Sequence, residues 1–239
     1  MFDTIIHFFY IILYQPLFNA LVLFYDYIPG NDFGVAIITL TLVIRFILYP
    51  VSVKAVTSQK SLQKLQPRIS EIQKKYKDDR EKQAKETLEL YKNEKINPFS
   101  GILLSLIQIP ILIALYRVFW NGLNPSELVN LYQFVLNPGH LNPMFLGIID
   151  LSKANIVMAV LAGVVQYFQT KMLIPKASLE KKKDGKTSDF SQVMQKQMVY
   201  FLPGFTVIIL LGLPSALGLY WTASGIFSII QQYFILKHD

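Results

Sequence analysis

A single arginine stands in the middle of a long apolar stretch of the chain. Arg45 belongs to TLVIRFILYP, residues 41–50, within an apolar run from Phe33 to Val53. A guanidinium offers five N–H donors and a permanent positive charge, so it can bind carboxylates, carbonyl oxygens or water. At the centre of a bilayer such a cation costs about 2.5–3.5 kcal/mol, and intramembrane charges usually mark functional sites.

The sequence offers this cation no obvious carboxylate partner. The later apolar runs of the chain contain no Asp or Glu, and Asp32 and Asp150 lie outside those runs. A buried ion pair would therefore lack its acidic member. We predict that Arg45 instead faces a water-filled cavity within the membrane.

Polar residues recur at helical spacing on the apolar runs. Thr41, Arg45 and Ser52 follow steps of four and seven residues, which places them on one helix face. Comparable stripes contain Ser105, Gln108 and Leu112; Gln166, Gln169 and Thr170; and Trp221, Ser224, Ser228 and Gln231. One such stripe alone is typical of hydrogen bonding between helices, whereas four stripes and an unpaired arginine favour a shared groove. The candidate groove residues are Arg45, Thr41, Ser52, Gln108, Gln166, Trp221, Ser224 and Ser228.

The elements that would hold these residues are membrane-spanning helices. Of the 239 residues 52% are hydrophobic and only 16% are charged, and the charged residues cluster. Several apolar runs approach the ~20 residues that a spanning helix needs. We therefore expect an all-α integral membrane protein with five transmembrane helices, at residues 33–53, 99–120, 154–174, 198–213 and 215–236.

The segment before the first span reads differently. Residues 1–32 are apolar and rich in Phe and Tyr, and Gln15-Pro16 interrupts the run. Aromatic residues mark the membrane–water interface, and proline disrupts a helix. We predict an extracytoplasmic, interfacial helix over residues 4–25, with a true span as the alternative. The start lacks the basic region of a secretory signal peptide.

The distribution of Lys and Arg predicts the orientation. Basic residues concentrate in segments 54–98 and 175–197, whereas residues 1–32 carry none. Because basic loops stay in the cytoplasm, both segments should be cytoplasmic. The N-terminus then lies outside, and the short tail 237–239 lies in the cytoplasm. The net charge of +7 follows from this topology and requires no nucleic-acid substrate.

Segment 54–98 has the pattern of an antiparallel helical hairpin. Apolar residues recur at alternating spacings of three and four, and Asp78 or Asp79 can cap a second helix. Pro67 should kink the first helix or mark its start. The hairpin is either a solvated connector or a contact surface for clients and partners. The candidate contact residues are Leu62, Leu65, Ile69, Lys74 and Lys75.

The remaining segments receive simpler predictions. Residues 121–153 should form an extracytoplasmic loop with a short interfacial helix at about 126–136, and segment 175–192 should be mobile. The fourth span, bracketed by Pro203 and Pro214, is short. A short span can be accommodated by thinning of the bilayer around it.

Composition excludes several kinds of chemistry. The absence of cysteine rules out disulfides and thiolate catalysis, and the three histidines lie outside the spans. No intramembrane carboxylate pair or clustered ligand set is present, so we expect no enzyme, no metal site and no cofactor. A channel or transporter remains an alternative, although coupled proton transport usually uses intramembrane acids, which this chain lacks.

Three stretches of the chain resemble the YidC/Oxa/Alb group of membrane protein insertases. They are GVAIITLTLVIRFILYPVSVKAVTSQKSLQKLQPRISEIQKKY, YKNEKINPFSGILLSLIQIPILIALYRVF and LPSALGLYWTASGIFSIIQQ. The resemblance implies a five-helix core and a groove open to the cytoplasm and lipid. It also implies that Arg45 and Thr41 lie in the groove, joined by Trp221 on the last span and by Gln166.

The same resemblance implies a chaperone-like insertase in the bacterial inner membrane. Its partners would be nascent or released membrane-protein clients and the lipid bilayer, with the ribosome and the Sec translocon as further candidates. Unlike larger bacterial members, the sequence has no large extracytoplasmic domain before residue 33 and no long basic tail after residue 236. The second difference argues against strong ribosome binding through a tail.

Overall fold

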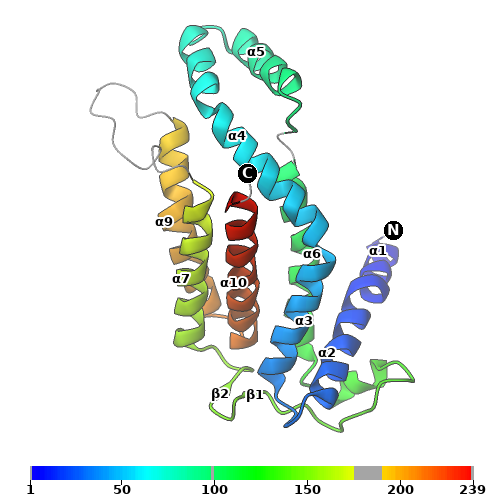
Figure 1. Ribbon diagram of the computed structural model, residues 1–239. Coiled ribbons are helices and arrows are strands. Elements are labelled where there is room, and N and C mark those ends of the chain that lie inside the picture. The colour runs from blue at the N-terminus through cyan, green and yellow to red at the C-terminus, as the bar shows by residue number, and fades with distance from the viewer. Residues whose placement is uncertain (1, 98–99, 175–189, 238–239) are drawn as a thin grey trace.

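The structure, a computed structural model, describes residues 2–97, 100–174 and 190–237. Within these residues, long helices run side by side, and a pair of helices extends beyond one end of the bundle (Figure 1). We call this the hairpin end of the molecule. The opposite end carries residues 121–155 and is called the loop end.

The apolar run that holds Arg45 is divided into two helices. Helix α3 spans Phe33–Ile47 and α4 spans Tyr49–Lys75, and the two are bent by 66°. The expectation of one continuous helix over 33–53 is therefore wrong. Pro50 lies in the first turn of α4. Because proline has no backbone N–H, it cannot continue the backbone hydrogen bonds of α3.

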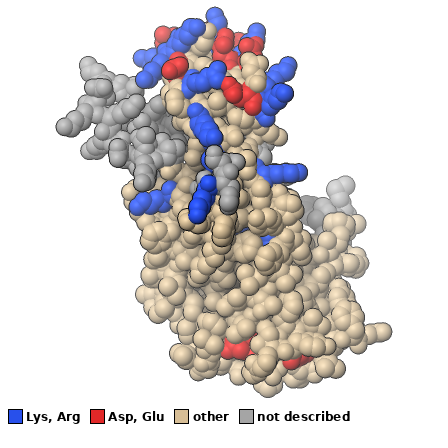
Figure 2. Space-filling view, viewed as in Figure 1, with Lys and Arg blue, Asp and Glu red and all other residues tan. Residues whose placement is uncertain are grey.

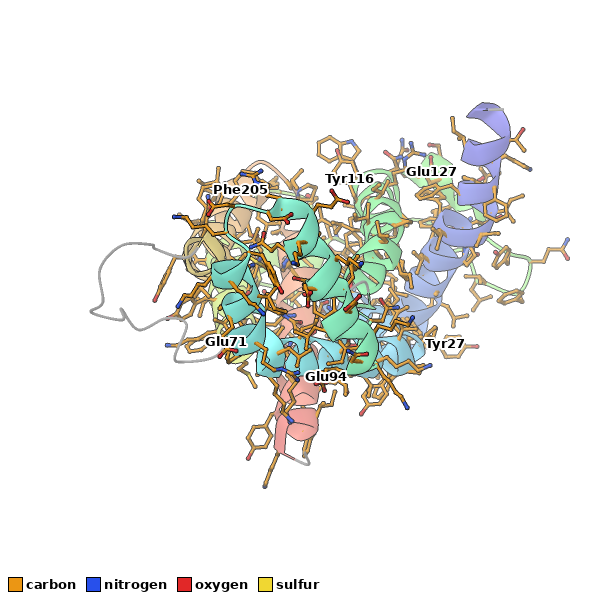
Figure 3. All side chains as sticks on the ribbon, turned by 90° about the horizontal axis from the view of Figure 1, so that it is seen from above. Tyr27, Glu71, Glu94, Tyr116, Glu127 and Phe205 are labelled. Carbon is orange, nitrogen blue, oxygen red and sulfur yellow. The ribbon has the colours of Figure 1, made fainter. Side chains whose placement is uncertain are left out.

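Helix α4 continues from the bundle into the hairpin, where it pairs with α5, Arg80–Asn93. Pro67 lies inside α4 and does not mark its start. The side chain of Asp79 accepts a hydrogen bond from Lys82 N at 2.9 Å, which confirms the predicted helix cap. Seen from the hairpin end (Figure 3), Glu71 of α4 lies on this hairpin, above the bundle.

The N-terminal segment is helical from Phe2 to Tyr27. Helix α1, Phe2–Phe9, passes through a π-helical turn, Tyr10–Tyr14, into α2, Gln15–Tyr27. Proline at position 16 does not break the helix, contrary to expectation. The wider turn before it accommodates a residue that cannot donate a backbone hydrogen bond.

This segment packs beside the bundle and is tied to the loop end. It contacts α3 and the later helix α6, and Asn19 Oδ1 accepts a hydrogen bond from Tyr132 N at 2.6 Å. Among the described residues, Ile6–Tyr27 is the one unbent helix long and apolar enough to cross a membrane by length and composition. The pair α3–α4 passes the same test as a bent span.

Four further helices complete the bundle. They are α6, Ser100–Asn121; α7, Ile156–Met172; α9, Phe190–Leu210; and α10, Ser215–Lys237. Helix α10 contacts α3, α4, α6, α7 and α9, so it occupies the centre of the arrangement. Pro203 lies inside α9 and does not bracket it as predicted, although the apolar part of α9, Gln197–Leu210, is short.

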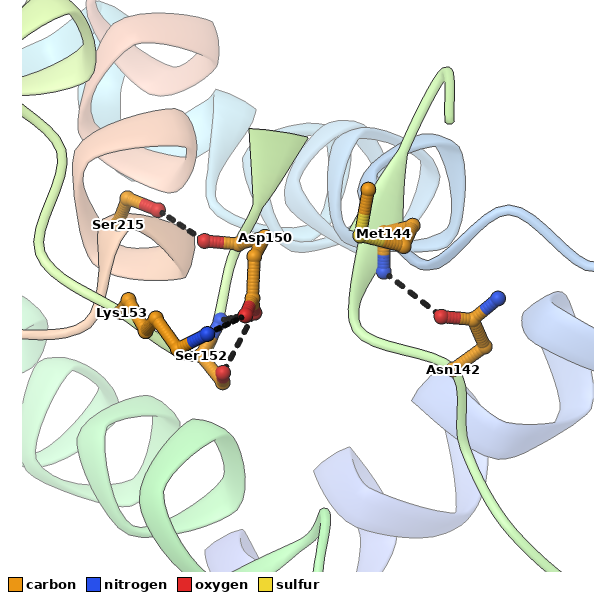
Figure 4. Close-up of polar contacts among 6 residues, drawn as sticks. All are labelled: Asn142, Met144, Asp150, Ser152, Lys153 and Ser215. Carbon is orange, nitrogen blue, oxygen red and sulfur yellow. Dashed lines mark hydrogen bonds and ion pairs between the residues drawn. The ribbon is translucent and has the colours of Figure 1, made fainter. Parts of the chain in front are cut away.

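The loop end contains little regular structure. A 3-10 helix, Pro125–Asn130, replaces the helix predicted at 126–136, and β1, Met144–Phe145, pairs antiparallel with β2, Ile149–Asp150. The chain after β2 caps α10, because Ser215 N donates to Lys153 O at 2.9 Å. Figure 4 shows Asp150, Lys153 and Ser215 at this junction. Of the segment predicted to be mobile, residues 175–192, positions 175–189 lie outside the described residues.

Charge separates along the long axis of the molecule. On the face shown in Figure 2, Lys and Arg gather toward the hairpin end, the middle is largely uncharged, and the charges visible at the loop end are acidic. Large apolar side chains such as Phe46, Phe205 and Phe234 are exposed on the outer surfaces of the helices. An exposed apolar belt of this kind suits a lipid environment.

Candidate functional site

Arg45 lies in the last turn of α3, just before the bend, and its side chain points toward α10. Its Nε donates to the hydroxyl of Ser224 at 2.8 Å, and Nη2 contacts the same oxygen. The residue is 9% exposed. The bend therefore places a largely buried cation against the central helix, with a neutral hydroxyl as its hydrogen-bond partner.

Two cavities meet at this arginine. The first measures about 430 Å³ and reaches from Arg45 along α4 to the hairpin-end residues Leu173 and Ile174. The second measures about 370 Å³ and lies between α4 and the later half of α10, with Ser52 and Ser228 in its walls. Both cavities share Arg45, Gln59, Gln108, Leu112, Gln169 and Leu173.

The cavity walls are polar but almost free of charge. Arg45 is the one charged residue among the described residues that line the two cavities, and none of these lining residues is acidic. A buried ion pair is thus not what accommodates the guanidinium here. The arrangement can instead present N–H donors and positive charge to a guest that enters the cavity.

Hydrogen bonds between helices hold the polar walls in place. Ser52 Oγ donates to Gln231 Oε1 at 2.8 Å, and Gln108 Nε2 donates to the hydroxyl of Tyr220 at 2.9 Å. The first bond joins α4 to α10 and the second joins α6 to α10. Side-chain hydrogen bonds therefore connect the cavity walls on α4 and α6 to the central helix, α10.

Comparison with known proteins places the chain in a family. The family model described as "60Kd inner membrane protein" matches residues 23–239. The chain belongs to the YidC/Oxa/Alb family of membrane protein insertases. A protein of Fusobacterium nucleatum named "Membrane protein insertase YidC" is 35% identical over 212 residues, which are 89% of each chain.

Longer members of the YidC/Oxa/Alb family also match. Proteins with the same printed name are 33% identical in Geobacter metallireducens and 36% identical in Francisella philomiragia. The matches cover 93% and 87% of this chain but only 36% and 33% of those relatives. The chain therefore corresponds to about a third of these longer relatives and to most of the Fusobacterium protein.

The structure brings together most of the residues predicted for the groove. Those that line one or both cavities are Arg45, Ser52, Gln108, Gln166, Trp221, Ser224 and Ser228. Thr41 is the exception, because it lines neither cavity. Its side chain is buried and its hydroxyl donates to Ile37 O at 2.6 Å within α3. The Thr41 hydroxyl is therefore satisfied by its own helix and is not directed into either cavity.

The predicted hairpin contacts separate into three groups. Leu62 lines the first cavity. Leu65 and Ile69 are buried with Leu90 in a small core between α4 and α5, so they hold the hairpin together and offer no free surface. Lys74 and Lys75 are exposed in the last turn of α4, and neither lines a cavity.

Sequence reasoning missed several residues that line the two cavities. Gln59, Gln63 and Gln66 of α4 line the first cavity, as does Tyr220, and Gln232 lines the second. The three glutamines of α4 follow steps of four and three, so helical periodicity could have found them. The sequence pattern assigns this part of α4 to the hairpin, as a connector or a contact surface for clients and partners, and so does not connect its glutamines with the groove.

Proposed function

We propose that this protein is a membrane protein insertase that moves a short hydrophilic segment of a client across the bilayer. It carries out no covalent reaction. The observation that carries the proposal is Arg45 in a cavity whose described lining holds no acidic residue. Family membership supports the same function, because the matched relatives bear the name of an insertase.

The proposed topology has five spans, with the N-terminus outside and the hairpin end in the cytoplasm. The first cavity then begins at the cytoplasmic side, near Leu173, and ends at Arg45. Water entering from that side hydrates the guanidinium within the inner leaflet. The short apolar part of α9, Gln197–Leu210, favours a locally thinned bilayer beside the cavity.

A client would use the cavity in two steps. Its hydrophilic tail enters from the cytoplasmic side, and an acidic tail is attracted by Arg45. Its apolar segment then moves into lipid along the outer faces of α3 and α10, driven by removal of apolar surface from water. The hairpin, including the exposed Lys74 and Lys75, would receive the client, and the ribosome and the Sec translocon are candidate partners at this surface.

Reconstitution into liposomes tests this function. The intact protein should speed the insertion of a single-span client with an acidic tail, scored by protection of the tail from external protease. Arg45→Ala should slow this client, and Arg45→Lys should retain most of the rate, since it keeps the positive charge. Equal rates for intact protein and empty liposomes would exclude an insertase. Ion currents without any client would favour a channel.

A further inference from the structure

The cavity walls carry an unusual concentration of carboxamides. Glutamines from four helices line the two cavities, in contrast to a single charged residue among the described lining. They are Gln59, Gln63 and Gln66 of α4, Gln108 of α6, Gln166 and Gln169 of α7, and Gln231 and Gln232 of α10. A carboxamide carries two N–H donors and an accepting oxygen without net charge. Attraction of an acidic tail alone would not require such groups.

Three of these glutamines have a buried polar atom without a partner. The atoms are Gln166 Oε1 in the first cavity and Gln231 Nε2 and Gln232 Oε1 in the second. The three residues are 9%, 4% and 3% exposed. Buried polar side-chain atoms normally have partners, so these two acceptors and one donor are available to cavity water and to a guest that replaces it.

The unpartnered atoms can reach such a guest without rebuilding the helices. Each belongs to a residue that lines a cavity, and the terminal torsion of a glutamine side chain is soft. Gln231 already uses its Oε1 to accept from Ser52, which leaves its Nε2 as the available donor. The second cavity thus presents a donor and an acceptor on consecutive residues of α10.

A neutral guest with alternating donors and acceptors matches these atoms. The backbone of an extended peptide has one N–H and one C=O per residue, whatever its side chains. Inside a bilayer each unpaired backbone group costs several kcal/mol, and a short polar segment has no helix or strand partner there. An anionic lipid headgroup or a free phosphate would instead favour a cluster of cations.

We propose that the glutamines around Arg45, above all Gln166, Gln231 and Gln232, bind the peptide backbone of the extended client segment during its passage. This inference rests on the proposed insertase function. The carboxamides take the place of water on client N–H and C=O groups, while Arg45 acts on acidic side chains. Insertion of a client with an uncharged tail should then depend on the glutamines and not on Arg45.

The test uses a synthetic single-span peptide with an uncharged Ser/Gly/Asn tail, added to proteoliposomes of the full chain. A second peptide carries backbone esters in the tail, which remove N–H donors and leave the side chains unchanged. Rates of tail protection are divided by the rates in empty liposomes. The variants are Gln166→Met and Gln232→Met, which remove free acceptors on two different helices. Gln133→Met, at an exposed loop position that lines neither cavity, is the control.

Loss of one hydrogen bond corresponds to about a three- to tenfold lower rate ratio. We expect each of the two cavity variants, Gln166→Met and Gln232→Met, to lower the rate ratio by this factor for the first peptide, whose tail has only amide bonds. The ratio for the ester-containing peptide should not change, because its tail already lacks the N–H donors that the glutamine oxygens would accept. Gln133→Met should match the intact protein. Equal slowing of both peptides, or no slowing of either, would overturn the backbone-binding role. No acceleration of the amide peptide by the intact protein would overturn the insertase function itself, and with it the inference.

Discussion

Arg45 and Ser224 lie 179 positions apart and form the central polar contact of the bundle, with Arg45 Nε 2.8 Å from Ser224 Oγ. Ser52, seven residues after Arg45 and already in α4, and Gln231, seven residues after Ser224 in α10, are separated by the same number of positions, and their Oγ and Oε1 atoms are also 2.8 Å apart. The constant separation means that α3, the first turn of α4 and α10 advance in the same direction along this contact, despite the 66° bend between α3 and α4. Polar residues at matching steps therefore face each other across one seam.

This contact predicts a stability difference between two neighbouring serines. Ser224→Ala removes the hydroxyl that accepts from Arg45 and should lower the free energy of unfolding in detergent micelles by about 1 kcal/mol. Ser228→Ala removes a hydroxyl that donates to Ser224 O of its own helix, at 3.0 Å, and should have almost no effect. Denaturation with increasing mole fractions of dodecyl sulfate measures both. Identical losses would show that the guanidinium contact contributes no stability.

Close packing of α7 against α9 gives a second matched pair. A Cβ at Gly163 would lie 2.4 Å from Val207 Cγ2 and 3.2 Å from Pro203 O, whereas a Cβ at Gly204 would have no atom within 4 Å. Small residues permit such approach of helices in membranes. Gly163→Ala should thus destabilise the protein by about 1–3 kcal/mol, because the β-branched side chain of Val207 has few other rotamers that would avoid the added methyl group.

Gly204→Ala tests the alternative that any alanine in these helices is harmful. It should be neutral or stabilise by up to about 1 kcal/mol, since alanine is the better helix former. The same denaturation experiment compares the two variants. A gain in stability for Gly163→Ala would mean that α9 is not held against α7 at this point.

Sequence patterns predicted the positions of the helices better than their interruptions. The runs at 99–120, 154–174 and 215–236 correspond closely to α6, α7 and α10, because apolar runs of that length have few other stable conformations in lipid. The bend at Leu48 and the π-helical turn at Tyr10–Tyr14 were not predicted. A proline follows each of these places, yet the helix stays unbent at Pro16 and bends by 66° before Pro50, so the presence of a proline does not by itself predict a bend.

The sequence pattern also predicted only part of the candidate site. The stripe that holds Ser224 and Ser228 was visible because both residues lie on one regular helix. Thr41 shares the face of Arg45 by spacing, yet its hydroxyl bonds its own helix and lines no cavity. Gln59, Gln63 and Gln66 line the first cavity because α4 continues as one helix from the bundle into the hairpin. Periodicity assigns a residue to a face, and tertiary packing decides what that face meets.

The hairpin should unfold independently of the bundle when its small core is weakened. Leu90 is 7% exposed and packs with Leu65 and Ile69, whereas Leu88 on the same helix is 62% exposed. Leu90→Ala should destabilise the hairpin by about 2 kcal/mol, the lower end for a buried leucine. Trypsin should then cut within residues 54–97 at least tenfold faster, because cleavage follows the population of opened chains.

Leu88→Ala is the control for this effect and should be cut at the rate of the intact protein. Digestion of purified protein in micelles, followed by mass spectrometry of the first fragments, gives both rates. Similar acceleration by the two variants, or cleavage confined to the bundle, would contradict a separate hairpin core.

The junction between β2 and α10 predicts a dependence on pH. A hydrogen bond from Lys153, supported by one from the Ser152 hydroxyl, holds the pKa of Asp150 below its ordinary value. This contribution to stability is complete above the ordinary pKa of about 3.9 and is lost as the pH falls through the lowered folded value. The segment that Asp150 anchors supplies the acceptors Lys153 O for Ser215 N and Leu151 O for Ala216 N (Figure 4 shows Asp150, Lys153 and Ser215).

Hydrogen exchange at Ser215 and Ala216 therefore reports the ionisation of Asp150. Protection factors, corrected for intrinsic exchange rates, should stay constant from pH 7 to about pH 4 and decrease below that. Asp150→Asn should lower protection near neutral pH and remove the decrease, because its amide does not titrate. Amides in the middle of α10 provide the internal control and should keep their protection throughout. A parallel decrease at those central amides would indicate general acid unfolding in place of release of the helix start.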